Sequence, residues 1–145
     1  MKNTHRAYIA GLVDGEGCIT IAKRKNGHHK EGKGRSWYYS PIVTIANTDK
    51  RMVDFVVNCY KGWITKPKPQ KSHYKQLYAW FIGGDRMKEF LKDILPYLIV
   101  KRKQAEIVLA FPCYKFGLSK RKTSRTKEEI EEQDSLWKRI KELND

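Results

Sequence analysis

The spacing of apolar and polar residues predicts a helix–strand–strand unit that occurs twice within residues 4–95. Apolar or small residues three and four positions apart predict amphipathic helices, whereas alternation of apolar and polar residues predicts strands with one buried face. The expected helices cover residues 4–15, 50–60, 84–95, 101–111 and 127–143. The expected strands cover residues 18–25, 36–46, 63–66 and 76–82.

Residues that commonly begin or interrupt elements refine these boundaries. Thr4 is a candidate cap for the first helix, and residues 47–49 supply capping side chains for the second. Thr126 and Glu129 have the spacing of a capping box before the last helix. Pro41 interrupts the second strand and predicts an edge position or a bulge there, because proline cannot donate to a strand ladder.

Side chains of opposite parity in the first two strands predict one covered and one open sheet face. Ile19 and Ile21 share a face of the first strand, and Val43 and Ile45 share a face of the second. The residues of the other parity are more polar, so we expect helices on the apolar face alone. The parity of the third and fourth strands stays open at this stage.

This order of elements predicts an α+β fold with αββαββα topology. The four antiparallel strands would form a saddle-shaped sheet, with further helices at the C-terminal end. The chain has 145 residues, which is the size of one domain. We expect residues 1–112 to form the core domain and residues 113–145 to add a basic loop and a helix packed on the same domain.

The charge of the chain points to a polyanionic partner. Lys+Arg number 30 against 16 Asp+Glu, giving a net charge of +14. The expected hairpin loops at residues 26–35 and 66–75 are rich in basic residues. A two-stranded ribbon fits the major groove of DNA, where base edges are read, and lysine and arginine neutralise phosphates. We therefore expect double-stranded DNA as the partner.

Other classes of protein and site fit the composition poorly. Cys18, Cys59 and Cys113 lie far apart without a CxxC pair, so neither a disulfide framework nor a zinc site is indicated. No apolar run reaches the about 18 residues of a membrane span, and no secretory segment begins the chain. We expect no membrane association and an intracellular location, in the compartment that holds the target DNA.

Residues 9–17 combine small residues, aliphatic residues and acids where the first expected helix leads into the first expected strand. Gly11 and Gly15 lie four positions apart, which lets a second helix approach closely. Asp14 and Glu16 follow at the expected helix C-terminus, where a negative charge is unfavourable unless a cation neutralises it. The pattern predicts a helix that packs on an equivalent helix and places an acid at the junction.

This stretch resembles the motif that names the LAGLIDADG homing endonucleases, and the αββαββα order is that family's fold. The chain carries one such motif and resembles the members with one motif, which act as homodimers. The resemblance implies a site-specific endonuclease that hydrolyses phosphodiesters at a long pseudo-palindromic target and leaves short 3′ overhangs. The alternative is a non-cleaving nucleic-acid-binding protein of the same fold, either an intron RNA maturase or a transcription regulator.

The resemblance also implies catalytic and metal-binding positions. Glu16 takes the place of the metal-binding acid, with the Gly15 carbonyl beside it, and Lys101 takes that of the catalytic-pocket lysine. Asn47 and Arg51 match polar and basic residues near the scissile phosphates. The implied metal is Mg²⁺, with Mn²⁺ as a substitute and Ca²⁺ as an ion that binds without supporting cleavage. No small-molecule cofactor is expected.

Two positions depart from the family pattern. Glu16 stands where Asp is more usual, and Asn47 where close relatives have Gln.

The sequence also predicts a dimer interface and a set of DNA contacts. The dimer interface is expected at Ala10, Gly11, Val13, Asp14 and Gly15. DNA contacts are expected, from strand parity and loop position, at Thr20, Ala22, Arg24, Asn26, His28, Tyr38, Ser40, Thr44, Thr65, Lys66 and Lys68.

Overall fold

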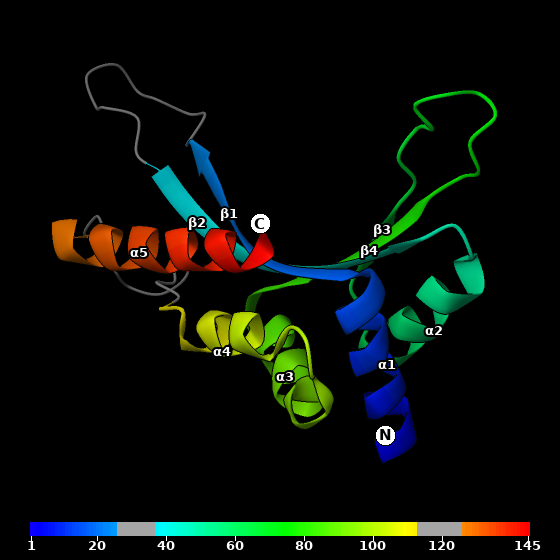
Figure 1. The fold of residues 1–145 in the computed structure, drawn as a ribbon, viewed down its shortest axis with the longest axis horizontal. Coiled ribbons are helices and arrows are strands. Elements are labelled where there is room, and N and C mark those ends of the chain that lie inside the picture. The colour runs from blue at the N-terminus through cyan, green and yellow to red at the C-terminus, as the bar shows by residue number, and fades with distance from the viewer. Residues whose placement is uncertain (26–36, 113–125) are drawn as a thin grey trace.

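The fold is described from a computed structural model that covers residues 1–25, 37–112 and 126–145. The chain forms the helices α1 to α5 and four strands, labelled in Figure 1, and the short 3-10 helix η1. Their order is α1 (Asn3–Glu16), β1 (Gly17–Lys25), β2 (Trp37–Asn47), α2 (Lys50–Tyr60), β3 (Trp63–Thr65), β4 (Tyr78–Gly83), α3 (Gly84–Ile94), η1 (Leu95–Tyr97), α4 (Arg102–Ala110) and α5 (Lys127–Asn144).

The four strands form one antiparallel sheet in the order β1-β2-β4-β3. In Figure 1 the β1–β2 hairpin and the β3–β4 hairpin rise apart from each other, above α1, α2, α3 and α4. The side of the sheet away from the helices is called the open face below. The predicted α+β class and αββαββα order are confirmed.

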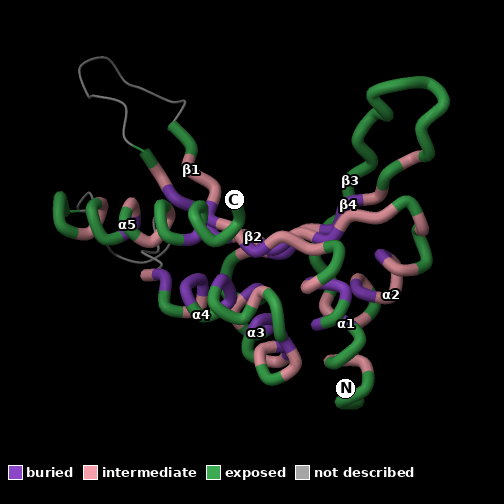
Figure 2. The backbone as a smooth tube through the Cα atoms, viewed as in Figure 1, coloured by how far each residue is buried: buried purple, intermediate pink, exposed green. Residues whose placement is uncertain are grey.

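The helix-facing side chains of the strands form the core, so the predicted strand parity is confirmed. These buried strand residues are Ile19, Ile21, Val43, Ile45, Trp80 and Ile82. Val53 and Val56 of α2 and Phe90 of α3 pack against them from below. Figure 2 shows the result, with buried backbone along the sheet and the inner sides of the helices.

The junction between α1 and β1 depends on Gly17. A Cβ atom at this position would lie 2.8 Å from Val13 Cα and 3.1 Å from the Thr44 carbonyl oxygen. Glycine therefore lets the chain turn directly from the last turn of α1 into the sheet. The expected cap at Thr4 is wrong, because α1 already begins at Asn3 and Lys2 is its N-cap residue.

Pro41 lies in an interior strand, but at a point where that strand has one neighbour, so the expected edge position holds locally and the expected bulge is wrong. The pairing of β1 with β2 runs without interruption from Gly17 with Ile45 to Lys25 with Trp37. Pairing of β2 with β4 begins only at Ile42, opposite Gly83. At Pro41 the strand therefore has a single neighbouring strand among the described residues, so the missing N–H breaks no ladder on the other side.

Helix α5 packs across the outer part of β1 and β2. The capping box predicted at its start is confirmed, because Thr126 and Glu129 each accept the other's main-chain N–H. Ile140 is buried in the core, and the Asn144 side-chain amide donates to the Ile19 carbonyl at 3.0 Å. Within the described ranges, none of the helices is both long enough and apolar enough to cross a membrane.

Candidate nucleic-acid interface and active site

Asp14 and Lys101 fasten the C-terminal end of α1 to the segment before α4. The Asp14 carboxylate accepts the main-chain N–H of Ile99 at 2.8 Å and that of Lys101 at 2.9 Å. The Lys101 ammonium in turn donates to the carbonyl oxygens of Val13 at 3.0 Å and Asp14 at 2.6 Å. A positive charge is also favourable at a helix C-terminus. This Asp14–Lys101 clamp therefore holds the Lys101 charge at the end of α1.

Glu16 ends α1 two residues beyond the clamp and is exposed. Its carboxylate forms no ion pair or hydrogen bond in the part of the chain that the structure describes. Lys101 also lies close to the start of β1: burial raises the pKa of the Cys18 thiol, and the Lys101 charge opposes that rise. The exposed Glu16 carboxylate and the hydrogen-bonded Lys101 ammonium therefore lie at the same end of α1.

Asn47 lies at the same end of the sheet. Gly17 pairs with Ile45, so Asn47 continues β2 two residues past that pair, beside the end of α1. Its side-chain oxygen accepts the Asp49 N–H at 2.8 Å, a turn that leads the chain into α2. The amide nitrogen of Asn47 has no acceptor among the described residues and is available to donate.

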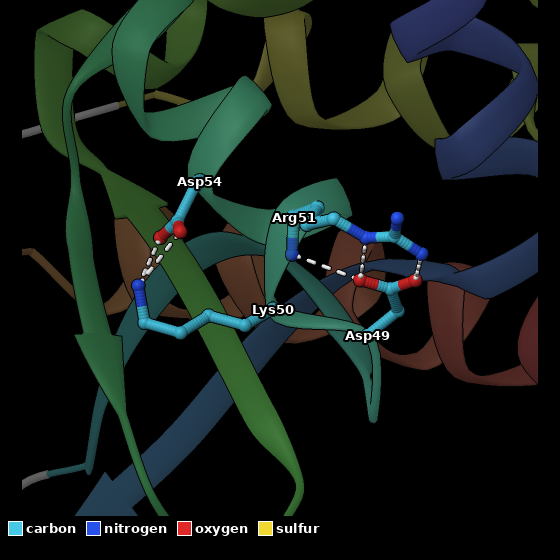
Figure 3. A network of polar contacts seen from close by, with 4 residues as sticks. All are labelled: Asp49, Lys50, Arg51 and Asp54. Atoms are coloured by element: carbon cyan, nitrogen blue, oxygen red, sulfur yellow. Dashed lines mark hydrogen bonds and ion pairs between the residues drawn. The ribbon is translucent and has the colours of Figure 1, made fainter.

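Arg51 is engaged by Asp49 rather than by the residues at the end of α1 (Figure 3). Its guanidinium binds the Asp49 carboxylate through two bonds of 3.0 and 2.6 Å, and its side chain is 90% exposed. These side-chain bonds, with the Arg51 N–H at 3.0 Å, lower the pKa of Asp49 to about 2. Arg51 lines a hollow with His5 and Tyr8, more than two helical turns before Glu16.

The outer side of α1 corrects part of the expected dimer interface. Ala10 and Val13 are both 0% exposed because they face the chain's own core, so neither side chain is available to a second copy. Gly11 and Gly15 are exposed, and a Cβ atom on either would meet nothing within 4 Å. The surface open to another helix therefore includes Gly11 and Gly15, which continue along α1 from the exposed Ala7 and Tyr8.

The open face contains most of the expected DNA contacts. The β1 and β2 residues on it are Thr20, Ala22, Arg24, Tyr38, Ser40 and Thr44, none of them buried. The structure also settles the parity of the other strands, since Thr65 pairs with Ala79 on this face. Lys66 and Lys68 follow β3 in the exposed connection to β4. Asn26 and His28 lie outside the described residues.

Comparison with solved structures identifies this architecture. The homing endonuclease I-CvuI, in complex with its target, superposes with a TM-score of 0.72 at 18% identity over 99% of this chain and 83% of that one. The archaeal intron-encoded homing endonuclease I-Vdi141I, complexed with DNA, gives 0.70 at 12% over 100% and 87%. The chain has the LAGLIDADG homing-endonuclease fold.

Longer members of this fold match over part of their length. The LAGLIDADG meganuclease I-AabMI, bound to uncleaved DNA, superposes with a TM-score of 0.52 at 22% identity, over 71% of this chain and 34% of that one. No family model and no curated protein matches the sequence. The likeness therefore rests on the three-dimensional arrangement of the homing-endonuclease fold.

The donor set at the end of α1 fits a hard divalent cation. Mg²⁺ is usually held by one or two carboxylates and by phosphate oxygens, and it keeps several waters. Glu16 offers an exposed carboxylate, and Gly15, whose carbonyl is the expected second ligand, is exposed directly before it. The described residues include no group of three His, Cys, Asp or Glu side chains that could hold a metal alone.

Sequence reasoning missed the polar network that joins α5 to the β1–β2 hairpin. Asp134 accepts from Lys23 at 2.7 Å, from the Tyr39 hydroxyl at 2.6 Å and from Lys138 at 2.9 Å. These bonds hold the pKa of Asp134 well below its usual range. The Trp137 ring lies 4.4 Å from the Lys23 ammonium. The sequence signal for this network is Lys23, which alternates in phase with the buried Ile19 and Ile21. A charged side chain on the covered face of a sheet requires a partner of opposite charge.

Proposed function

We propose that this chain is a site-specific, double-strand DNA endonuclease that acts as a homodimer with Mg²⁺. The observation that carries the proposal is the placement of Glu16 and Lys101 at the same end of α1, in a chain with the homing-endonuclease fold. The solved neighbours I-CvuI and I-Vdi141I are homing endonucleases in complex with DNA. The net charge of +14 supports the same partner.

Hydrolysis of a phosphodiester needs a positioned water and neutralisation of charge on the phosphate. Lys101, held by the carbonyls of Val13 and Asp14, contributes a positive charge of fixed position. Asn47 has an amide group that can orient water through hydrogen bonds. Arg51 supplies a second positive charge once it exchanges Asp49 for a phosphate. Mg²⁺, when bound, stabilises developing negative charge and lowers the pKa of a ligated water.

A second copy of the chain completes the site. One chain supplies a single exposed acid at this junction, Glu16, while Asp14 is occupied by main-chain donors. The exposed Gly11–Gly15 stripe of α1 allows two such helices to approach closely about a two-fold axis. Two Glu16 carboxylates would then face two scissile phosphates. The enzyme would act in whichever compartment holds its target.

Selection and cleavage of a randomised duplex library tests this proposal. The purified protein is incubated with the library in Mg²⁺ and, separately, in chelator, and the cut ends are sequenced. We expect Mg²⁺-dependent double-strand cuts with short 3′ overhangs. Glu16→Gln should abolish cutting and keep binding, whereas Glu132→Gln, an exposed acid on α5, should change neither. Binding without cutting by the wild-type protein would favour the non-cleaving alternative.

A further inference from the structure

Three side chains form an apolar patch on the open face of the sheet. Trp63 of β3 is 49% exposed, and its indole stacks on the Phe81 ring with centroids 5.7 Å apart and planes 12° apart. A Cβ atom on Gly83 would lie 3.9 Å from Trp63 Cη2, so the indole extends over Gly83. Ile42, the partner of Gly83 in β2, is half-buried on the same face. Trp63, Phe81 and Ile42 are called the apolar patch below.

The main chain before Trp63 is held in place, so the patch is formed before any ligand binds. Lys61 and Gly62 both have left-handed backbone conformations, with φ of 60° and 87°. The indole N–H of the buried Trp80 donates to the Lys61 carbonyl and secures this turn. Stacking on Phe81 then fixes the ring itself. A preorganised aromatic surface loses little conformational freedom on binding.

The surroundings of the patch match the major groove of a DNA duplex. Thr44 pairs with Phe81, and Thr20 pairs with Ile42, so hydroxyl groups able to reach base edges flank it on the β1–β2 side. Lys61 and Lys66, both exposed, lie close to Trp63 along the chain and can bind phosphates. The apolar group that a base pair presents in the major groove is the C5 methyl of thymine.

We propose that the apolar patch is a thymine-methyl subsite, which makes Trp63 and Phe81 determinants of target specificity. The inference rests on the proposed DNA-binding function and adds to it a preference at a defined place on the sheet. The same contact disfavours RNA, because uracil lacks the methyl group and the major groove of A-form duplexes is too narrow for side chains. Trp63 also leaves its indole N–H free to donate, since no acceptor binds it among the described residues.

Uracil substitution in a selected duplex tests the subsite. The wild-type protein selects duplexes from a randomised library in chelator, and each thymine of the best-bound duplex is then replaced in turn by uracil. We expect one thymine per half-site at which the replacement weakens binding about fourfold, the value of one buried methyl group. Trp63→Ala should bind the thymine and uracil duplexes equally. Trp63→Phe, which keeps a ring on Phe81, should retain most of the difference.

A matched control and the outcomes separate this inference from the proposed function. Leu143→Ala removes an exposed apolar side chain from α5, away from the open face, and should leave every uracil penalty unchanged. If Trp63→Ala keeps the wild-type penalty at all thymines, or if no thymine is sensitive, the subsite is overturned. If no duplex is enriched at all, the proposed function itself fails, and the subsite fails with it.

Discussion

Lys101 and Asp14 bind each other's main chain. The Lys101 ammonium lies 2.6 Å from the Asp14 carbonyl oxygen, and Asp14 Oδ1 lies 2.9 Å from the Lys101 nitrogen. This reciprocal contact makes the two acids of the α1–β1 junction unequal. Asp14 is used to hold the fold together, whereas Glu16 keeps an exposed carboxylate.

Substitution of the two acids should therefore change the stability of the fold to different extents. Asp14→Ala removes two hydrogen bonds to a charged acceptor, each worth about 1.5–3 kcal/mol, and should lower the free energy of unfolding by about 3–6 kcal/mol. Glu16→Gln should change it by less than about 0.5 kcal/mol, as for an exposed site. Urea unfolding followed by tryptophan fluorescence measures both. Equal losses would show that Glu16 is also structural.

Gly11 should control dimer formation without affecting the fold of one chain. A Cβ atom there meets nothing within 4 Å in the single chain, and leucine favours a helix over glycine by about 1 kcal/mol. Gly11→Leu should therefore keep or raise thermal stability but weaken dimerisation at least about tenfold, which corresponds to 1.4 kcal/mol. Sedimentation equilibrium gives the dissociation constant. Asn58→Leu, on the exposed side of α2, is the control and should leave dimerisation unchanged.

Asp49 and DNA should compete for Arg51. Asp49→Asn keeps a good N-cap residue for α2 but releases the guanidinium, so the salt dependence of DNA binding should steepen by about one phosphate contact. Fluorescence anisotropy across a range of salt concentrations measures the slope. Asp54→Asn changes the net charge equally and frees Lys50, its exposed partner in Figure 3. Identical slopes in both variants would mean that only net charge matters.

Acid should weaken the attachment of α5 to the β1–β2 hairpin. The pKa of Asp134 is lower in the folded chain than the usual unfolded value of about 3.9, so its contribution is complete above that value and is lost as pH falls further. Wild-type stability should fall between about pH 4 and pH 2. Asp134→Asn should cost about 1–3 kcal/mol at pH 7 and flatten this decline. Thermal unfolding across this range is the measurement.

The control for this pH dependence is a second acid on the same helix. Glu132→Gln removes an exposed carboxylate of α5 and should reproduce the wild-type pH profile. A profile for Asp134→Asn that parallels the wild type would show that other carboxylates cause the acid sensitivity. The Tyr39 hydroxyl and Lys23 would then not depend on the Asp134 charge for their positions.

Local sequence patterns were sufficient to predict the helices and strands, and the face of the β1–β2 hairpin that the helices cover. Ile19, Ile21, Val43 and Ile45 alternate strictly, and burial of one strand face leaves no other arrangement for them. Patterns were misleading where tertiary contacts replace local signals. Thr4 looks like a helix cap but lies inside α1. Pro41 predicted an edge strand or a bulge, but β2 is an interior strand that lacks a second neighbour only where β4 ends.

The sequence by itself determined the helix–strand–strand repeat, the positive charge, and the acid–glycine motif at the end of α1, because each is a property of neighbouring residues. Only the tertiary structure decided which residues meet across long separations. It brought Lys101 onto the α1 carbonyls, Asp134 onto Lys23, and Trp63 onto Phe81. It also turned Ala10 and Val13 into the core, because the side of a helix that a sheet covers depends on how the two pack.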